Sequence, residues 1–211
     1  MIVSVSVLSS TIKPKEIVKK LDSSKADYIH IDIMDGKFVE NKTWTFEEVK
    51  KFTDGSRLPL DVHLMVNNPK PYLEKYAMLN TRIITFHPEA VKNIDDLIET
   101  IKDYGLEVGL AINPETDAEV IFPYLNKISQ VIVMGVHPGA SGQSFIESTP
   151  NKISKLREEI NKQGLSTHIS VDGGINNETG LLCKEAGCDT LVSASYVHKD
   201  VINNINILKN L

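Results

Sequence analysis

Four residues of this sequence carry side chains suited to metal binding or proton transfer. His30 and Asp32 alternate with isoleucines, so both side chains lie on one face of an extended segment. His63 and Asp172 occupy similar places in two later apolar runs. Imidazole nitrogens and carboxylate oxygens suit a divalent transition metal, and paired carboxylates suit acid–base catalysis. A single residue of this kind is more often a hydrogen-bonding residue, but four of them together favour a metal site.

The elements that would position these residues alternate along the whole chain. Short runs rich in Val and Ile predict buried parallel strands, with amphipathic helices between them. The expected strands are Ile2–Leu8, Tyr28–Ile33, Leu60–Met65, Arg82–Phe86, Glu107–Ile112, Gln130–Val136, Thr167–Val171 and Thr190–Ser193. The expected helices are Pro14–Asp22, Phe46–Phe52, Lys70–Met78, Ile94–Tyr104, Ala118–Leu125, Pro150–Gln163, Asn177–Ala186 and Val201–Leu211. Gly105, Gly164 and Gly187 sit just past helix ends, where a left-handed residue is common.

This alternation predicts an α/β fold, a (β/α)8 TIM barrel that covers residues 1–211 as a single domain. A doubly wound open sheet is the alternative, but it usually has fewer strands and a glycine-rich turn after the first one. The corresponding segment here, Leu8–Thr11, contains no glycine. Because the catalytic groups of such barrels lie at the C-terminal ends of the strands, we expect the four residues to meet on one rim.

Composition excludes several other function classes. The 211 residues carry a formal net charge of -5 without a long basic run, which argues against nucleic acid as the main partner. No apolar run is long enough to span a membrane, and the N-terminus lacks the features of a signal peptide. Cys183 and Cys188 are too few for a disulfide framework and are expected to be reduced packing residues. We therefore expect a cytoplasmic protein.

Longer motifs resemble the ribulose-phosphate 3-epimerase family. The motifs are Ser6–Ser9, His30–Val39, Leu60–Val66, Val133–Gly139 followed by Ser141–Phe145, and Val171–Ile175. The resemblance extends from about Ser4 to Ser195. It implies a barrel enzyme that interconverts D-ribulose 5-phosphate and D-xylulose 5-phosphate with one divalent metal ion (Zn, Fe, Mn or Co). It also implies a small phosphosugar as the partner and a homo-oligomer as the assembly.

The resemblance further implies roles for individual residues. The metal ligands would be His30, Asp32, His63 and Asp172, with Asp32 and Asp172 as the acid–base pair. The enediolate intermediate would lie on Met34, Met65 and Met134. Sugar and phosphate contacts would come from Ser6, His63, Gly139, Ala140, Ser141, Gly142, Asp172, Gly173, Gly174, Ala194 and Ser195. The phosphate segments contain no Lys or Arg, so backbone N–H groups would have to hold the anion.

Two other functions remain open. Ala140, Ser141 and Ala194 depart from the residues usual in the family, which leaves room for a hexulose 6-phosphate such as D-allulose 6-phosphate. A non-catalytic phosphosugar-binding protein is the alternative of another class, although it would have no reason to keep both aspartates with the histidines. Ala194 would be strained if its position required a positive φ. We interpret His87 as a supporting or structural residue and His137 as a solvent-facing loop residue.

Overall fold

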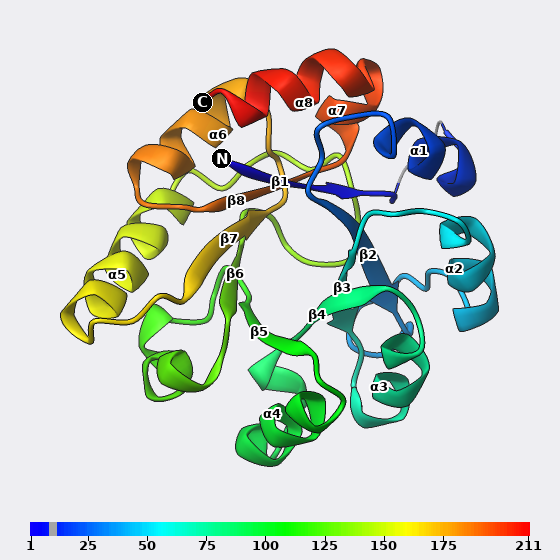
Figure 1. Cartoon of the computed structure of the whole chain (residues 1–211). Coiled ribbons are helices and arrows are strands. Elements are labelled where there is room, and N and C mark those ends of the chain that lie inside the picture. The colour runs from blue at the N-terminus through cyan, green and yellow to red at the C-terminus, as the bar shows by residue number, and fades with distance from the viewer. Residues whose placement is uncertain (9–11) are drawn as a thin grey trace.

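Eight short apolar runs form the parallel strands of a closed barrel, which helices surround (Figure 1). The computed structural model describes residues 1–8 and 12–211, so Ser9 of the N-terminal motif lies outside the described residues. The strands are β1 Ile2–Ser6, β2 Tyr28–Met34, β3 Leu60–Met65, β4 Thr81–Phe86, β5 Glu107–Ile112, β6 Gln130–Met134, β7 His168–Asp172 and β8 Thr190–Ser193. They follow one another in chain order, and β8 pairs with β1. The predicted (β/α)8 barrel is therefore confirmed, and the open sheet is excluded.

The alternation of side chains along each strand separates two environments. In β2, Ile29, Ile31 and Ile33 are buried in the main hydrophobic core, while His30 and Asp32 lie on the other face of the strand. Polar side chains of other strands also lie buried inside the barrel, and the Gln130 amide donates to Thr85 Oγ1 at 3.1 Å. The barrel thus has an apolar outer layer under the helices and an interior that combines hydrogen-bonded polar side chains with a small apolar cluster of Ala111, Ile132 and Met134.

The helices follow the expected pattern closely. They are α1 Pro14–Leu21, α2 Phe46–Thr53, α3 Lys70–Ala77, α4 Ile94–Asp103, α5 Thr149–Lys162, α6 Asn177–Glu185, α7 Ser195–Lys199 and α8 Val201–Lys209. Gly105, Gly164 and Gly187 have φ values of +74°, +67° and +104°, which confirms the left-handed residues expected past three helix ends. Strand and helix ends agree with the prediction to within two residues.

One predicted helix is wrong. Residues 118–125 form no α-helix, and two 3-10 helices, Ala118–Val120 and Phe122–Lys127, occupy this region. Pro123 lacks the N–H group that an α-helix through this segment would need. The short helix α7 and the 3-10 helix Pro88–Ala90 were not predicted, because neither is long enough to show a helical period.

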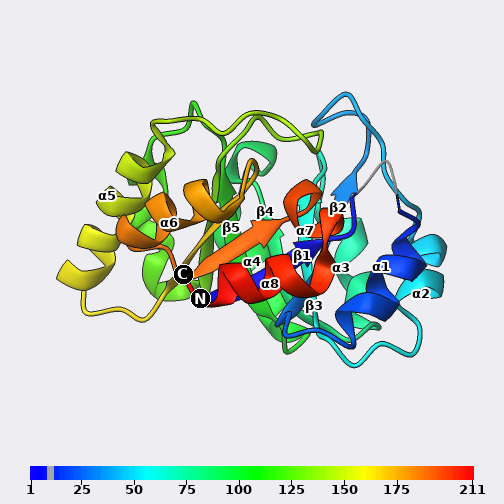
Figure 2. The same cartoon turned by 90° about the horizontal axis from the view of Figure 1, so that it is seen from above.

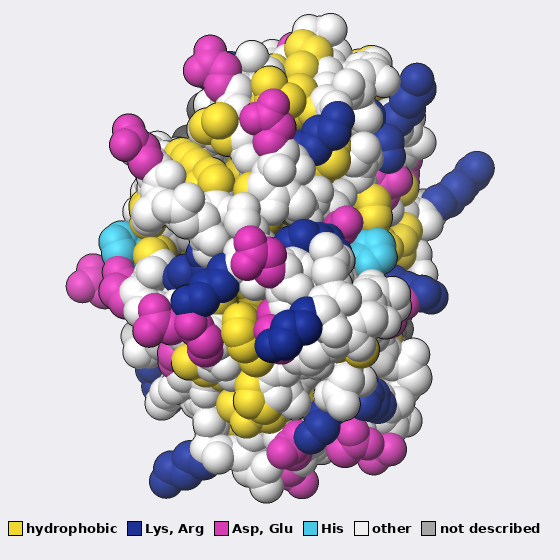
Figure 3. Space-filling model, turned by 90° about the vertical axis from the view of Figure 1, so that its left-hand side faces the viewer, with side chains coloured by type: hydrophobic (Ala, Val, Ile, Leu, Met, Phe, Trp, Pro, Cys, Tyr) yellow, Lys and Arg dark blue, Asp and Glu magenta, His cyan; other side chains and the backbone are white. Residues whose placement is uncertain are grey.

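The two termini lie side by side in both views (Figures 1 and 2), and the Met1 amino group donates to Lys209 O at 3.3 Å. On the face that carries α5 and α6, acidic and basic side chains are interspersed (Figure 3). Within the described ranges, no helix has the length and apolar character needed to cross a membrane.

Candidate active site

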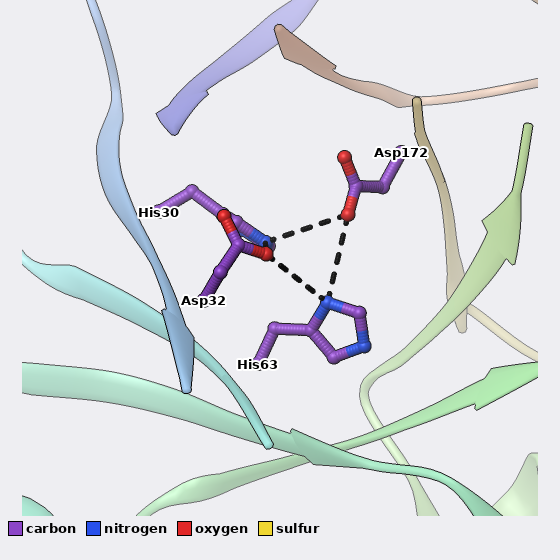
Figure 4. A group of neighbouring side chains, drawn as sticks. All are labelled: His30, Asp32, His63 and Asp172. Carbon is purple, nitrogen blue, oxygen red and sulfur yellow. Dashed lines mark ion pairs between the residues drawn. The ribbon is translucent and has the colours of Figure 1, made fainter. Parts of the chain in front are cut away.

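Four side chains converge inside the carboxyl end of the barrel (Figure 4): His30 and Asp32 from β2, His63 from β3 and Asp172 from β7. One ligand atom from each residue lies within 4.8 Å of the other three. His30 Nε2 lies 3.4 Å from Asp32 Oδ1 and 3.7 Å from Asp172 Oδ2. His63 Nδ1 lies 3.6 Å and 3.5 Å from the same two oxygens. This cage of two nitrogens and two oxygens could hold one metal ion.

Strand register brings these residues together. In the β2–β3 pair, Asp32 lies beside His63 and His30 lies beside Asp61. The two neighbouring strands therefore place both of these pairs in the barrel interior. Asp172 ends β7, which β8 and β1 separate from β2. The two carboxylates of the cage therefore approach it from different parts of the barrel wall.

Two nitrogen atoms of the cage lack hydrogen-bond partners. His30 Nε2 and His63 Nδ1 are fully buried, and neither has a partner among the described residues. A buried polar atom left without a partner costs roughly 1–3 kcal/mol. Both atoms face the two carboxylate oxygens, as unprotonated metal ligands would, so the donor set fits a divalent metal.

A buried carboxylate holds His30 from the other side. His30 Nδ1 lies 2.8 Å from Asp61 Oδ2, which also accepts a 2.9 Å hydrogen bond from Ser4 Oγ. Burial raises the pKa of Asp61, but the charge and hydrogen bond of His30 lower it by a larger amount, so the net shift is downward. Burial lowers the pKa of His30, yet Asp61 and Asp32 raise it well above its usual value. No role was predicted for Asp61 from the sequence, although its position two residues before His63 places it on the same face of the strand.

His63 is held by a second imidazole. His63 Nε2 lies 2.8 Å from His87 Nε2, and His87 Nδ1 lies 3.6 Å from Glu89 Oε2. Burial lowers the pKa of His87 to about 4, so this ring is neutral at physiological pH. The interpretation of His87 as a supporting residue agrees with this contact. Glu89 was not identified from the sequence, because no local spacing links it to His63.

Asp32 is ionised although it is buried. Burial raises its pKa, but His30 and His63 together lower it well below the usual value. Ser6 Oγ donates a 2.6 Å hydrogen bond to Asp32 Oδ2, which leaves the other oxygen, Oδ1, facing the two imidazoles. Asp32 is therefore a carboxylate anion held in a fixed orientation at the edge of the cage.

A pocket opens directly above this cage. Most of the residues expected to act on the sugar, the phosphate or the intermediate line this pocket. They are Ser6, Asp32, Met34, Met65, Met134, Gly139, Ala140, Ser141, Gly142, Asp172, Gly173, Gly174, Ala194 and Ser195. His63 is fully buried and is not part of the pocket wall. Six strand ends and loops that are distant in sequence therefore form one cavity around Asp32 and Asp172.

Backbone geometry explains the small residues at one end of the pocket. Gly173 and Gly174 have φ values of +108° and +69°, and a Cβ atom at these positions would lie 2.3 Å from Val136 and 2.8 Å from Phe145. Their N–H groups donate to no other described residue. Ala194 has a φ of -118°, so the strain considered for this alanine does not arise.

Other residues considered in the sequence have simpler surroundings. The His137 side chain is 61% exposed and pairs with Glu115 at 3.1 Å, which agrees with a solvent-facing loop residue, but it also lines the pocket above the cage. Cys183 and Cys188 are free and buried, which agrees with their expected packing role.

The fold and the site together define an enzyme class: (β/α)8 barrels with a buried His–Asp cage beneath a glycine-lined pocket at the carboxyl ends of the strands. A model of the ribulose-phosphate 3 epimerase family matches residues 2–198. The chain belongs to the ribulose-phosphate 3-epimerase family, and it is an enzyme of the isomerase class.

Several curated relatives carry the name ribulose-phosphate 3-epimerase. The Chlamydia pneumoniae protein is 40% identical over 181 residues, which cover 85% of this chain and 79% of the relative. The Helicobacter pylori J99 protein is 37% identical over 182 residues, covering 86% and 84%. The Methanocaldococcus jannaschii protein is 41% identical over 186 residues, covering 87% and 77%.

More distant solved structures share the fold alone. A mutant tryptophan synthase alpha-subunit from Pyrococcus furiosus superposes with a TM-score of 0.69 at 14% identity, covering 99% of this chain and 94% of the other. The N-(5'-phosphoribosyl)anthranilate isomerase of the same organism gives a TM-score of 0.66 at 18% identity and covers all of both chains.

Proposed function

We propose that the protein is a metal-dependent 3-epimerase that interconverts D-ribulose 5-phosphate and D-xylulose 5-phosphate. The observation that carries this proposal is the approach of Asp32 and Asp172 to one cage from strands β2 and β7. Inverting a carbon next to a ketone requires a proton to leave one face and another to arrive on the opposite face. One carboxylate cannot reach both faces of a planar enediolate, so the reaction needs two of them on separate elements.

The two carboxylates divide the proton transfers. Asp32 is held ionised by the two histidines and oriented by Ser6, which suits it to remove the proton at carbon 3. Asp172, across the pocket, delivers a proton to the other face. In the reverse direction the two aspartates exchange roles.

One divalent metal ion (Zn, Fe, Mn or Co) completes the proposed site. His30 Nε2, His63 Nδ1 and one oxygen each from Asp32 and Asp172 would hold it. When bound, the metal supplies positive charge that stabilises the negative charge developing on the substrate oxygens. Met34, Met65 and Met134 line the pocket with thioethers, which exclude water and offer no competing proton.

The glycine-lined end of the pocket would bind the phosphate. Support comes from the free N–H groups of Gly173 and Gly174, and from the small residues 139–142, 194 and 195 along the same wall. Backbone N–H groups bind phosphate well where small side chains permit close approach. Ser6 and Asp172, which line the pocket, complete the proposed set of substrate residues, and His63, buried beneath the pocket, would act on the substrate through the metal.

A hexulose 6-phosphate such as D-allulose 6-phosphate is the second candidate substrate. Ala140, Ser141 and Ala194 differ from the residues usual in the family, and all three line the pocket. They therefore lie where a five-carbon and a six-carbon sugar phosphate would be distinguished. The test compares kcat/KM on the pentulose and hexulose phosphates after loading with each metal. We expect the pentulose phosphate to be preferred, and a strong hexulose preference would overturn this choice. Binding without turnover of either sugar would instead support a phosphosugar-binding protein.

We further propose that this single-domain barrel acts in the cytoplasm as a homo-oligomer. The family resemblance supports the assembly, and the absence of a basic run supports a small-molecule partner. Sedimentation of the purified chain should then give a mass that is a multiple of 23.5 kDa, and a monomer mass at micromolar concentration would contradict it.

A further inference from the structure

A chain of polar contacts leads from His63 to the turn that follows β5. It begins at the 2.8 Å contact between His63 Nε2 and His87 Nε2. Both rings are fully buried, and their planes are inclined by 23°. The Phe38 ring packs against His87 with 4.8 Å between the ring centroids. Neither imidazole is free to turn without breaking these contacts.

The short nitrogen–nitrogen contact fixes the position of one proton. Two neutral imidazole nitrogens can approach this closely only if one donates and the other accepts. Since a metal at the cage requires an unprotonated His63 Nδ1, His63 must carry its proton on Nε2 and donate it to His87. His87 must then carry its own proton on Nδ1, a buried atom that has no hydrogen-bond partner among the described residues and lies 3.6 Å from Glu89 Oε2, so this link is an electrostatic contact.

Glu89 is itself held in place. Its other oxygen, Oε1, accepts hydrogen bonds from the Thr116 hydroxyl and, at 3.3 Å, from the Asn113 backbone N–H. Residues 113–116 form a turn closed by a 3.1 Å hydrogen bond from Thr116 N to Asn113 O. The carboxylate therefore bridges the end of β4 and the turn after β5.

A lysine from α5 anchors this turn. Lys152 Nζ donates to the carbonyl oxygens of Asn113, Pro114 and Thr116 at 2.9, 2.8 and 2.6 Å. His30 is held differently, by Asp61 at 2.8 Å, which in turn accepts hydrogen bonds from Ser4 and Gln130 inside the barrel. The contacts that hold His63 lead instead out of the barrel interior to the turn after β5.

We propose that His87 and Glu89 are positioning residues that hold His63 in the tautomer whose Nδ1 is free to bind a metal, with Lys152 as the outer anchor of the series. This inference deepens the proposed function, because it rests on His63 being a metal ligand. It assigns no contact with substrate to His87, Glu89 or Lys152.

The test uses two substitutions of His87 and a direct measurement of metal affinity. The metal-free proteins are titrated with Co²⁺ against a competing chelator, and the visible spectrum of bound Co²⁺ is recorded. His87→Phe keeps an aromatic ring but removes the acceptor, so we expect Co²⁺ affinity to fall about 10–100-fold and the spectrum to change. His87→Gln places a carboxamide oxygen where Nε2 lay, so it should recover most of the affinity.

This pair of variants separates positioning from packing. If His87 only filled space, His87→Phe would bind Co²⁺ at least as tightly as His87→Gln, and that result would overturn the inference. Glu89→Gln and Lys152→Met, farther from the cage, should weaken Co²⁺ binding in the same direction by smaller factors. They also keep the inference testable if His87→Phe fails to fold. His168→Gln, at an exposed histidine that begins β7, is the control and should bind as the unsubstituted protein does.

The same titration distinguishes failure of the inference from failure of the proposed function. If the unsubstituted protein binds Co²⁺ and epimerises its substrate while His87→Phe binds equally well, only the inference is contradicted. If the unsubstituted protein binds no Co²⁺, both are contradicted.

Discussion

At the scale of single residues, the site depends on carboxylates that stay ionised inside the barrel. Burial alone would raise the pKa values of Asp32 and Asp61, but adjacent imidazoles reverse the direction of both shifts. The same carboxylates raise the pKa of His30. Each group is therefore stable in its buried position only because its neighbours are present.

Substitution of Asp172 tests the acid–base assignment. Asp172→Asn preserves size but cannot transfer the proton, so we expect kcat to fall by about 10²–10⁴. The free energy of unfolding of the metal-free protein should change little, since the Asp172 side chain is 15% exposed and ends its strand. Asp54→Asn, at an exposed residue beyond α2, is the control and should keep full turnover. Near-normal turnover of Asp172→Asn would exclude its role.

Glu89 predicts a pH dependence of stability. Burial raises the pKa of Glu89, but the nearby His87 ring and the Thr116 hydroxyl outweigh it and lower the pKa to about 2, compared with its usual 4.5. The ionised carboxylate thus stabilises the folded state above pH 4.5, and this contribution is lost as the pH falls towards 2. The unfolding free-energy difference between the unsubstituted protein and Glu89→Gln should shrink by about 1 kcal/mol from about pH 6 to about pH 3.5, after allowance for partial exposure.

This prediction is checked by denaturant unfolding of both metal-free proteins across that pH range. A difference that stays constant, or grows on acidification, would show that Glu89 is not held as a stabilising anion.

Single residues were only partly predictable from the sequence. His30, Asp32, His63 and Asp172 could be found because each falls at a regular place on an apolar run. Glu89 could not be found, since its role arises from the pairing of β3 with β4 and from a turn that follows β5. Such contacts depend on strand register, which local spacing does not encode.

At the scale of elements, the loops after the strands form the pocket, and their glycines have defined conformations. Gly142, in the pocket wall, has a φ of +78°, and an added Cβ would meet no atom of the described residues within 4 Å. Gly55, between α2 and β3, has a φ of +82° and the same open surroundings. Both positions therefore favour glycine for the same backbone reason, but only Gly142 lies in the pocket wall.

This similarity gives a matched pair of substitutions. Gly142→Ala and Gly55→Ala should each destabilise the protein by about 1 kcal/mol, the cost of a left-handed alanine. Only Gly142→Ala should also raise KM, because its loop is proposed to bind the phosphate. Steady-state kinetics and denaturant unfolding measure both quantities. An equal KM for the two variants would contradict a phosphate role for this loop.

Element types were largely predictable because strand and helix periods differ clearly in this chain. The exceptions were segments in which a local feature overrides the period. Pro123 prevents an α-helix in a stretch that is otherwise amphipathic, and α7 spans only five residues. Segments of this length bury too little apolar surface to leave a periodic signal.

At the scale of the whole molecule, alternation of strands and helices predicted the closed barrel, and the structure confirms it. The organisation of residues 1–211 as a single domain stays a prediction. The four residues of the cage meet only because the barrel is closed. Asp172 on β7 reaches the residues of β2 because β8 pairs with β1. A metal held by β2, β3 and β7 would therefore link distant parts of the chain.

Metal binding should consequently stabilise the whole fold. A ligand that binds only the folded state at about 100 times its Kd adds about 2.7 kcal/mol. We expect Tm to fall on chelation and to recover with Zn, Mn, Fe or Co, as monitored by calorimetry. His63→Phe should abolish this response. A Tm that no divalent metal changes would contradict the proposed cage.

The most direct test of the account is the fate of hydrogen at carbon 3. The metal-loaded protein is incubated with ribulose 5-phosphate in deuterium oxide, and the xylulose 5-phosphate formed is analysed by NMR. Proton transfer by two opposed carboxylates predicts deuterium at carbon 3 of the product. Product that forms at a normal rate but retains the original hydrogen would contradict it.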